Sequence, residues 1–167
     1  MGLRALIITA IATFVLDQAS KWLVVHQMNL LELGEIDLIP PVLNLRMAWN
    51  QGINFGLFAN SADAVRWGLI AIALLISGYV LWWVIKQRAG RWAMLSAGLL
   101  IGGAMGNVVD RVAYGAVADF LNMSCCGIEN PFSFNIADIA VFAGALGLVV
   151  FAQNPSVSKP PKRRKTP

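Results

Sequence analysis

Residues 67–85 read WGLIAIALLISGYVLWWVI, a run with no charged side chain between Arg66 and Lys86. Its 19 residues are enough to cross the hydrocarbon core of a bilayer as one α-helix. The run therefore predicts a transmembrane helix, and the rest of the chain can be interpreted from this starting point.

The composition of the whole chain agrees with a membrane protein. Of its 167 residues, 57% are hydrophobic and 13% are charged, whereas a soluble domain carries about 25% charged residues. The mean hydropathy is +0.65. A globule of this size leaves a large share of its surface in water and cannot hide so much apolar material. Four helices of about 20 residues would use most of the apolar residues, so no separate soluble domain is expected.

Three further apolar runs complete a prediction of four transmembrane helices. They cover residues 5–25, 92–109 and 136–152. The first begins like a secretory signal sequence, but its A-x-A-like triplet comes too early, so we expect an uncleaved helix. All seven prolines lie outside the four spans. The predicted fold is an all-α integral membrane protein with one domain over residues 1–153 and a disordered basic tail over 154–167.

The distribution of basic residues predicts the orientation, because Lys and Arg collect in the short cytoplasmic flanks of membrane helices. Nine of the thirteen lie before the first span, between the second and third spans, or in the tail, and these segments contain no acidic residue. The nine are Arg4, Lys86, Arg88, Arg91, Lys159, Lys162, Arg163, Arg164 and Lys165. We therefore expect both termini to be cytoplasmic and the acidic residues to lie toward the outer face.

The first outer segment, residues 26–64, contains a predicted β element. Residues 43–50, LNLRMAWN, alternate between apolar and polar side chains, and turn residues bound them on both sides. The sequence therefore predicts a small β element on the outer surface. The second outer segment, residues 111–135, contains glycine and asparagine and has a proline before the fourth span.

Several classes of site lack support in the sequence. Cys125 and Cys126 are adjacent and form no CxxC motif, and His26 is the single histidine, so no metal or other cofactor is predicted. The basic tail fits membrane topology and contact with anionic lipid, not nucleic-acid binding. The chain also has no GxSxG motif and no serine with a plausible histidine partner. Carboxyl groups are therefore the only candidates in the sequence for catalysing hydrolysis.

Two groups of polar residues fall within the predicted spans. Asp17 and Lys21 are spaced i, i+4 in the first span, and Asn107, Asp110 and Arg111 share one face at the outer end of the third. Arg111 can pair with Asp110 or with another acidic residue. For both groups, a structural ion pair or clamp and a direct functional role remain open.

Asp119 and Asp138 differ from the other acidic residues because neither has a basic residue within four positions. Both stand in apolar sequence, where burial tends to raise the pKa of a carboxyl group. Two such groups at one depth could share a proton and activate water for peptide hydrolysis. Separate roles in an ion or proton pathway are the alternative that spacing alone leaves open.

Five blocks of sequence resemble the lipoprotein signal peptidases, also called signal peptidase II, of bacterial membranes. The blocks are DQASK (17–21), NQGINFG (50–56), GGAMGNVVDR (102–111), VADF (117–120) and FNIAD (134–138). They follow the order and spacing of that family and extend over essentially the whole chain except the tail. One departure is the pair Ile53–Asn54, where many members have two small residues.

This resemblance implies an aspartic endopeptidase with four helices and a small outward β cradle. The implied substrate is a prolipoprotein, cut immediately before its diacylglyceryl-modified Cys. By their positions in the blocks, Asp119 and Asp138 are the implied catalytic pair. The residues implied to bind substrate or support the site are Asp17, Lys21, Asn50, Gly52, Asn107, Asp110, Arg111 and Asn135. A monomer in the bacterial inner membrane is expected, with its active site near the outer face.

A small proton- or cation-coupled transporter is the alternative function. It would use Asp17, Asp110, Asp119 and Asp138 as relays, and it predicts acidic residues distributed through the depth of the bilayer. The orientation inferred above instead places them toward one face. A structural subunit that assembles with partner helices would leave Asp119 and Asp138 without a role.

Overall fold

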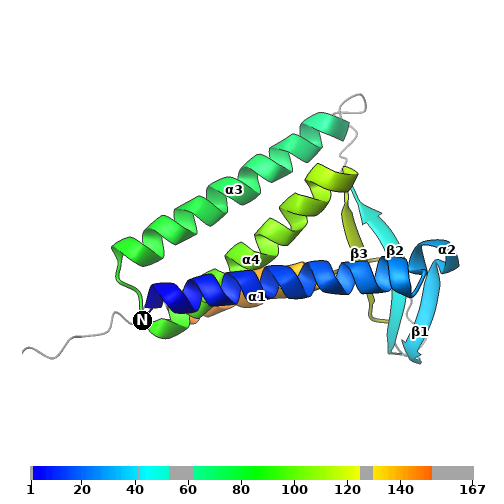
Figure 1. The fold of residues 1–167 in the computed structure, drawn as a ribbon, viewed down its shortest axis with the longest axis horizontal. Coiled ribbons are helices and arrows are strands. Elements are labelled where there is room, and N and C mark those ends of the chain that lie inside the picture. Colours follow the sequence, from blue (N-terminus) through cyan, green and yellow to red (C-terminus); the bar gives the residue numbers. More distant parts are fainter. Residues whose placement is uncertain (1, 41, 53–61, 125–129, 152–167) are drawn as a thin grey trace, which may run out of the picture.

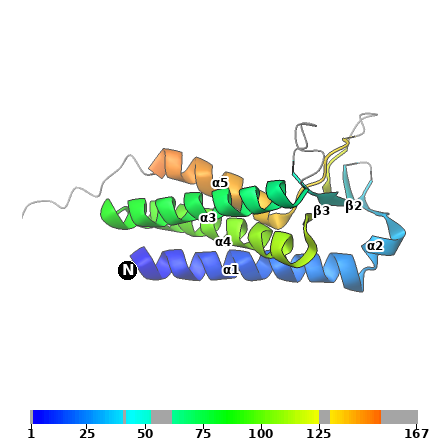
Figure 2. The same cartoon turned by 90° about the horizontal axis from the view of Figure 1, so that it is seen from above.

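The computed structural model describes residues 2–40, 42–52, 62–124 and 130–151. Its four long helices are α1 (Gly2–Trp22), α3 (Ala62–Lys86), α4 (Arg91–Tyr114) and α5 (Ile136–Phe151). Helix α4 packs along both α1 and α5, and less extensively along α3 (Figures 1 and 2). The pairs Ile53–Asn54 and Cys125–Cys126 and the tail 154–167 lie outside the described residues.

One end of the bundle holds the N-terminus, the connection between α3 and α4, and the C-terminal end of α5 (Figures 1 and 2). An apolar cluster closes this end, formed by Leu6, Val80, Val84, Met94, Ala97 and Leu100. The β-sheet lies at the opposite end of the bundle. The N-terminus and the connection between α3 and α4 therefore lie at one end of the bundle, and the sheet lies at the other (Figures 1 and 2).

Three of the helical segments are long and apolar enough to cross a membrane, namely Gly2–Gln27, Asp63–Lys86 and Arg91–Tyr114. They make the chain an integral membrane protein. The fourth predicted span is helical but has only 16 residues, Ile136–Phe151. At 1.5 Å per residue this is about 24 Å, less than the roughly 30 Å of a hydrocarbon core.

Helix α4 extends five residues beyond the predicted end of the third span at residue 109. Gly115 ends it in the left-handed conformation, with φ of 79°. The N–H of Gly115 donates to the carbonyl oxygen of Arg111, which satisfies one of the last free acceptors of the helix. The extra turn keeps Asn107, Asp110 and Arg111 on a rigid helix at the end that meets the sheet.

A three-stranded antiparallel sheet and two short helical segments form a layer at the end of the bundle opposite the N-terminus (Figure 1). These elements are the π-helix η1 (Leu23–Gln27), α2 (Leu30–Leu33), β1 (Glu35–Ile39), β2 (Leu43–Asn50) and β3 (Val117–Asn122), with strand order β1-β2-β3. The strand predicted over 43–50 is confirmed with the same bounds. Val24, Leu30, Leu45 and Phe120 form the apolar cluster under this layer.

Strand β3 lies within residues 111–135, where no strand was predicted from the sequence. Five of its six residues are buried, so it lacks the alternation of a strand with one solvent face. Asp119 pairs with Ala48, and Ala118 pairs with Trp49. Because successive side chains point to opposite faces, Asp119 lies on the face of the sheet that Ala118 and Trp49 do not share.

Candidate active site

The first turn of α5 is fixed by three hydrogen bonds that also orient Asp138. Asn135 precedes the helix, and its Oδ1 accepts the Asp138 N–H at 2.9 Å. In return, Asp138 Oδ2 accepts the Asn135 N–H at 3.2 Å. Asp17 of α1 accepts the Ala137 N–H at 2.9 Å. Since the first N–H groups of a helix have no partner inside it, these bonds satisfy them and hold the Asp138 carboxyl at the helix end.

Asp119 is held on β3 by two amide side chains. Its relative exposure is 2%, and its Oδ1 and Oδ2 accept hydrogen bonds from Asn135 Nδ2 at 2.6 Å and Asn50 Nδ2 at 3.0 Å. The N–H of Gly52 donates to Asn50 Oδ1 at 2.9 Å and so turns the amide group of Asn50 toward Asp119. Gly52 has a φ of 90°, a backbone conformation that residues other than glycine rarely adopt.

Two asparagines connect Asp119 to Asp138. Asn135 Nδ2, which bonds Asp119, also donates to Asn107 Oδ1 at 3.2 Å. Asn107 Nδ2 in turn donates to Asp138 Oδ1 at 2.9 Å. The structure therefore brings the two aspartates, 19 positions apart in the sequence, into one network. Each carboxyl group keeps acceptor capacity beyond these bonds, because a carboxylate offers about four lone-pair positions.

The electrostatic surroundings of Asp119 favour its protonated form. Asp119 lies on β3, outside the long helices, and burial together with the neighbouring Asp138 carboxyl raises the pKa of Asp119 to about 6. The hydrogen bonds from Asn50 and Asn135 act in the opposite direction, because they stabilise the ionised form. Asp138 is only partly buried, so the network reaches the surface of the protein at Asp138. The arrangement can hold a proton on Asp119 up to about pH 6 while offering a second carboxyl group.

A second polar cluster lies between α1 and α4. Lys21 Nζ is 2.7 Å from Asp17 Oδ2 and 2.7 Å from Asp110 Oδ2. Lys21 also donates to Asn107 Oδ1 at 3.4 Å, which joins this cluster to the network of the two aspartates. The relative exposures of Asp17, Lys21 and Asp110 are 0%, 6% and 1%. The predicted pair of Asp17 and Lys21 is thus confirmed, and it gains a third member from another helix.

The cluster also holds the backbone next to each of the two aspartates. Asp110 Oδ2 accepts the N–H of Ala118, the residue before Asp119, at 3.2 Å. Asp17 Oδ1 accepts the N–H of Ala137, the residue before Asp138. Because Lys21 bridges the two carboxylates, a single ammonium group ties together the positions of β3 and the start of α5.

Arg111 does not pair with Asp110, one of the possible partners that the sequence left open. Its Nη1 donates to the carbonyl oxygen of Asn107 in the same helix at 3.3 Å, and Asp110 pairs with Lys21 instead. Among the described residues, no carboxylate lies within ion-pairing distance of Arg111. Asp138 and Asp119 are nonetheless close enough to act on its charge. Its guanidinium group therefore stands beside the network with donors to spare.

Gln18 is a site residue to which sequence reasoning gave no role. Its Nε2 lies 3.0 Å from Asp110 Oδ1, 3.2 Å from Asp17 Oδ2 and 3.3 Å from the Gly106 carbonyl oxygen. It thus braces the same two carboxylates that Lys21 bridges. Its place next to Asp17 in the first block was a signal, but only the packing of α1 on α4 identifies its partners.

Comparisons with known proteins agree with this architecture. The family described as Signal peptidase (SPase) II matches residues 9–153. A lipoprotein signal peptidase of Methylobacterium sp. (strain 4-46) is 42% identical, over 85% of this chain and 84% of its own length. One from Sphingopyxis alaskensis is 38% identical, over 90% of this chain and 86% of its own length.

Solved structures extend the likeness to the fold. A bacterial membrane enzyme determined at 1.9 Å resolution superposes with a TM-score of 0.74 at 26% identity, covering 87% of this chain and 90% of that one. A second, at 2.3 Å resolution, gives a TM-score of 0.72 at 26% identity, covering 96% and 94%. With the family matched over nearly all of α1 to α5, the chain belongs to the signal peptidase II family, the lipoprotein signal peptidases.

Proposed function

We propose that this protein is an aspartic endopeptidase that removes signal peptides from diacylglyceryl-modified prolipoproteins, cutting before the lipidated Cys of the substrate. Membership of the signal peptidase II family supports peptide-bond cleavage in lipoproteins. The observation that carries the catalytic type is the network in which Asn135 and Asn107 connect Asp119 to Asp138. Two linked carboxyl groups, one of them with a raised pKa, can serve as the acid and the base for hydrolysis with water as the nucleophile.

The two carboxyl groups have complementary roles in this mechanism. One is ionised and takes a proton from a water molecule as that water attacks the scissile carbonyl carbon. The other is protonated and donates a hydrogen bond to the carbonyl oxygen, which stabilises the developing oxyanion. The raised pKa of Asp119 favours Asp119 as the proton donor and leaves the base role to Asp138. The apparent pKa values of the reaction belong to the pair, because the groups are coupled.

The amide and guanidinium groups around the pair complete the proposed site. Asn50, turned by Gly52, and Asn135 fix the Asp119 carboxyl group. Arg111 has free donors beside the pair and is proposed to hold a carbonyl oxygen of the substrate backbone. The sheet that carries Asn50 and Asp119 forms the proposed cradle for the lipidated Cys. No metal or other cofactor has a part in this mechanism.

The proposed membrane arrangement has four spans, with both termini in the cytoplasm of a bacterial inner membrane and the site near the outer face. Helix α5 serves as the fourth span. Its shorter length is compatible with a start inside the outer interface, where its first turn is bonded to α1 and capped by Asn135. The chain is proposed to act as a monomer surrounded by membrane lipid.

The topology gives a first prediction. Reporter fusions at Gly90 and at the C-terminus should report the cytoplasm, and a fusion at Asp63 should report the outside, because nine basic residues and no acidic ones lie on the proposed inner side. Reporters of both types, one active inside and one active outside, check each position. A C-terminal reporter active outside would contradict the four-span arrangement.

The substrate gives a second prediction. Purified protein should cleave a prolipoprotein carrying the diacylglyceryl group and leave the unmodified precursor intact, because the cradle is proposed to bind the lipidated Cys. The measurement is the appearance of the shortened lipoprotein by mass spectrometry, with the new N-terminus identified. Equal cleavage of both precursors would contradict lipid recognition, and no cleavage of either would contradict the proposed activity.

Asn50 gives a third prediction, because its amide group bonds the Asp119 carboxyl directly. Asn50→Ala should lower turnover about tenfold, because the Asp119 carboxyl group loses one of the two hydrogen bonds that fix its position. It should also raise the pKa of Asp119, since the lost bond favoured the ionised form. Activity that depends on protonated Asp119 falls as pH rises, so this decline should move to higher pH.

A matched control for Asn50 is Asn44→Ala on the same strand, where the side chain bonds Glu35. Turnover and the pH profile should both stay near those of the unmodified protein. An Asn50→Ala protein with normal turnover and an unmoved profile would restrict β2 to a structural role.

The transporter alternative is not favoured. Asp17, Asp110, Asp119 and Asp138 belong to one bonded group at the sheet end of the bundle, not to a series through the depth of the bilayer. A relay across the membrane would need ionisable groups toward the other end of α1 and α4.

A further inference from the structure

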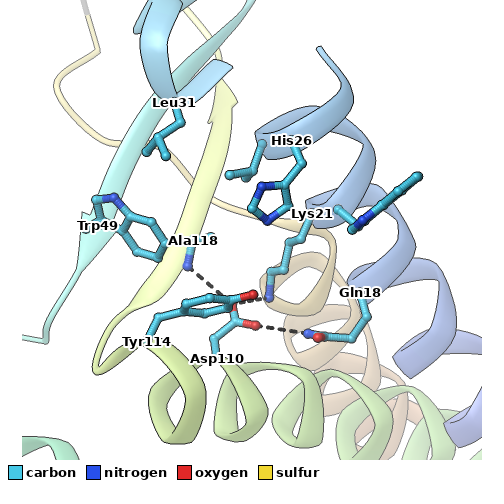
Figure 3. Close-up of a pocket in the computed structure, with 10 residues that line it drawn as sticks. Gln18, Lys21, His26, Leu31, Trp49, Asp110, Tyr114 and Ala118 are labelled. Carbon is cyan, nitrogen blue, oxygen red and sulfur yellow. Dashed lines mark hydrogen bonds and ion pairs between the residues drawn. The ribbon is translucent and has the colours of Figure 1, made fainter. Parts of the chain in front are cut away.

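A cavity of about 430 Å³ lies beside the sheet (Figure 3). Trp49 and Ala118, which pair across β2 and β3, line it. Ala48 and Asp119 form the next pair of this ladder and point to the opposite face. The cavity is therefore separated from Asp119 by β3 itself, and the proposed reaction makes no use of it.

Three aromatic side chains form much of the wall. They are Trp22 at the end of α1, Trp49 on β2 and Tyr114 at the end of α4. Their relative exposures are 57%, 41% and 60%. The rings of Trp49 and Tyr114 have centroids 5.7 Å apart and planes inclined at 51°, so they form a corner of the cavity. Val25 and Leu31 add apolar surface.

The floor of the cavity is polar, and its charged residues belong to a bonded group. Gln18, Lys21 and Asp110 line it, as Figure 3 shows, and Lys21 also pairs with Asp17, which does not line the cavity. This group contains two carboxylates and one ammonium. Lys21 already bonds both carboxylates, at 2.7 Å each, so it has little left to offer an anionic ligand. A cation entering the cavity would meet aromatic faces, the imidazole of His26 and the Asp110 carboxylate (Figure 3).

We propose that this cavity binds the ammonium headgroup of a zwitterionic phospholipid. Ammonium groups bind over the faces of Trp and Tyr, and the Asp110 carboxylate is the one acidic group among the described residues that line the cavity. The apolar wall fits the glycerol and upper acyl region of the lipid, and a mouth lined with Trp and Tyr is typical of the membrane interface. The lipid would lie against Ala118, next to Asp119, and so adjoin the proposed active site without entering it.

The test compares three lipids with identical acyl chains: phosphatidylethanolamine, its N-acetylated derivative and phosphatidylglycerol. The purified full chain is delipidated in detergent, mixed with each lipid, and the retained lipid is counted by native mass spectrometry. Phosphatidylethanolamine should be retained about threefold more than the N-acetylated lipid, which lacks the charge needed for the aromatic contact. Equal retention of all three, or a preference for phosphatidylglycerol, would overturn the proposal.

Variants locate the binding in this cavity. Trp49→Leu and Tyr114→Leu should abolish the preference for phosphatidylethanolamine. Trp67→Leu is the matched control, because this exposed tryptophan on α3 does not line the cavity and should leave the preference intact. A preference that persists in both cavity variants would overturn the assignment. Because no step measures cleavage, the result is independent of the proposed peptidase activity.

Discussion

Purified Asp119→Asn and Asp138→Asn proteins are expected to stay folded and to lose at least about 100-fold in turnover, the lower end of what general acid–base groups contribute. Asparagine keeps the shape and some hydrogen bonding of each carboxyl group but cannot take up or release the proton. At Asp119 the change removes the proposed donor to the carbonyl oxygen, and at Asp138 it removes the proposed base for water.

The double variant sharpens this test. If the two aspartates act as one unit, Asp119→Asn/Asp138→Asn should be little slower than either single variant, because the pair is already disabled. Turnover of a diacylglyceryl-modified prolipoprotein is the measurement, and thermal unfolding in detergent checks that each variant is folded. Asp37→Asn on β1, at the edge of the same sheet, is the control and should retain normal turnover. Near-normal turnover in either single variant would remove that residue from the mechanism.

The pH profile adds a separate check on the unmodified protein. The proposed donor must be protonated, and its pKa is about 6, so kcat/KM should decline as pH rises through this region. At low pH the proposed base also becomes protonated, and activity should decline again, which gives a bell-shaped profile. A profile that stays flat from about pH 5 to about pH 8 would exclude proton donation by Asp119.

Much of the membrane architecture could be predicted from local sequence. Uncharged runs such as 67–85 have few alternatives to a membrane helix, and α3 follows that run closely. The strand over 43–50 was predictable because one face is more buried than the other, which imposes a period of two. Both signals depend on neighbours within one element.

The missed features depend on contacts between distant elements. Strand β3 is buried on both faces, so its sequence does not alternate. The pairing of Asp110 with Lys21 instead of the adjacent Arg111 is decided by how α1 packs on α4, 89 positions apart in sequence. One signal was available: Asn135 stands three residues before Asp138 at the start of an apolar run, which is the pattern of a helix cap.

Lys21 carries the second large expected effect, because its ammonium group bridges two buried carboxylates. Lys21→Met should lower the free energy of unfolding by about 3 kcal/mol or more, since it leaves Asp17 and Asp110 facing each other without a counter-charge. Asp63→Asn is the control, because its ion pair with Arg66 spans 3.7 Å and Asp63 is 87% exposed. Such surface pairs contribute little, so that variant should unfold like the unmodified protein.

A double variant that restores the charge balance of this cluster distinguishes an effect on stability from an effect on the position of Asp119. Lys21→Met/Asp110→Asn removes one of the two facing carboxylates, so it should recover part of the lost stability. Its turnover should nevertheless stay low with KM little changed, because an asparagine side chain has a single acceptor oxygen, whereas Asp110 bonds Gln18, Lys21 and the Ala118 N–H. Weaker anchoring of Ala118 displaces Asp119, and a small displacement of an acid–base group reduces kcat more than binding. If turnover returned in proportion to stability, Lys21 and Asp110 would be holding the fold together without positioning the proposed catalytic pair.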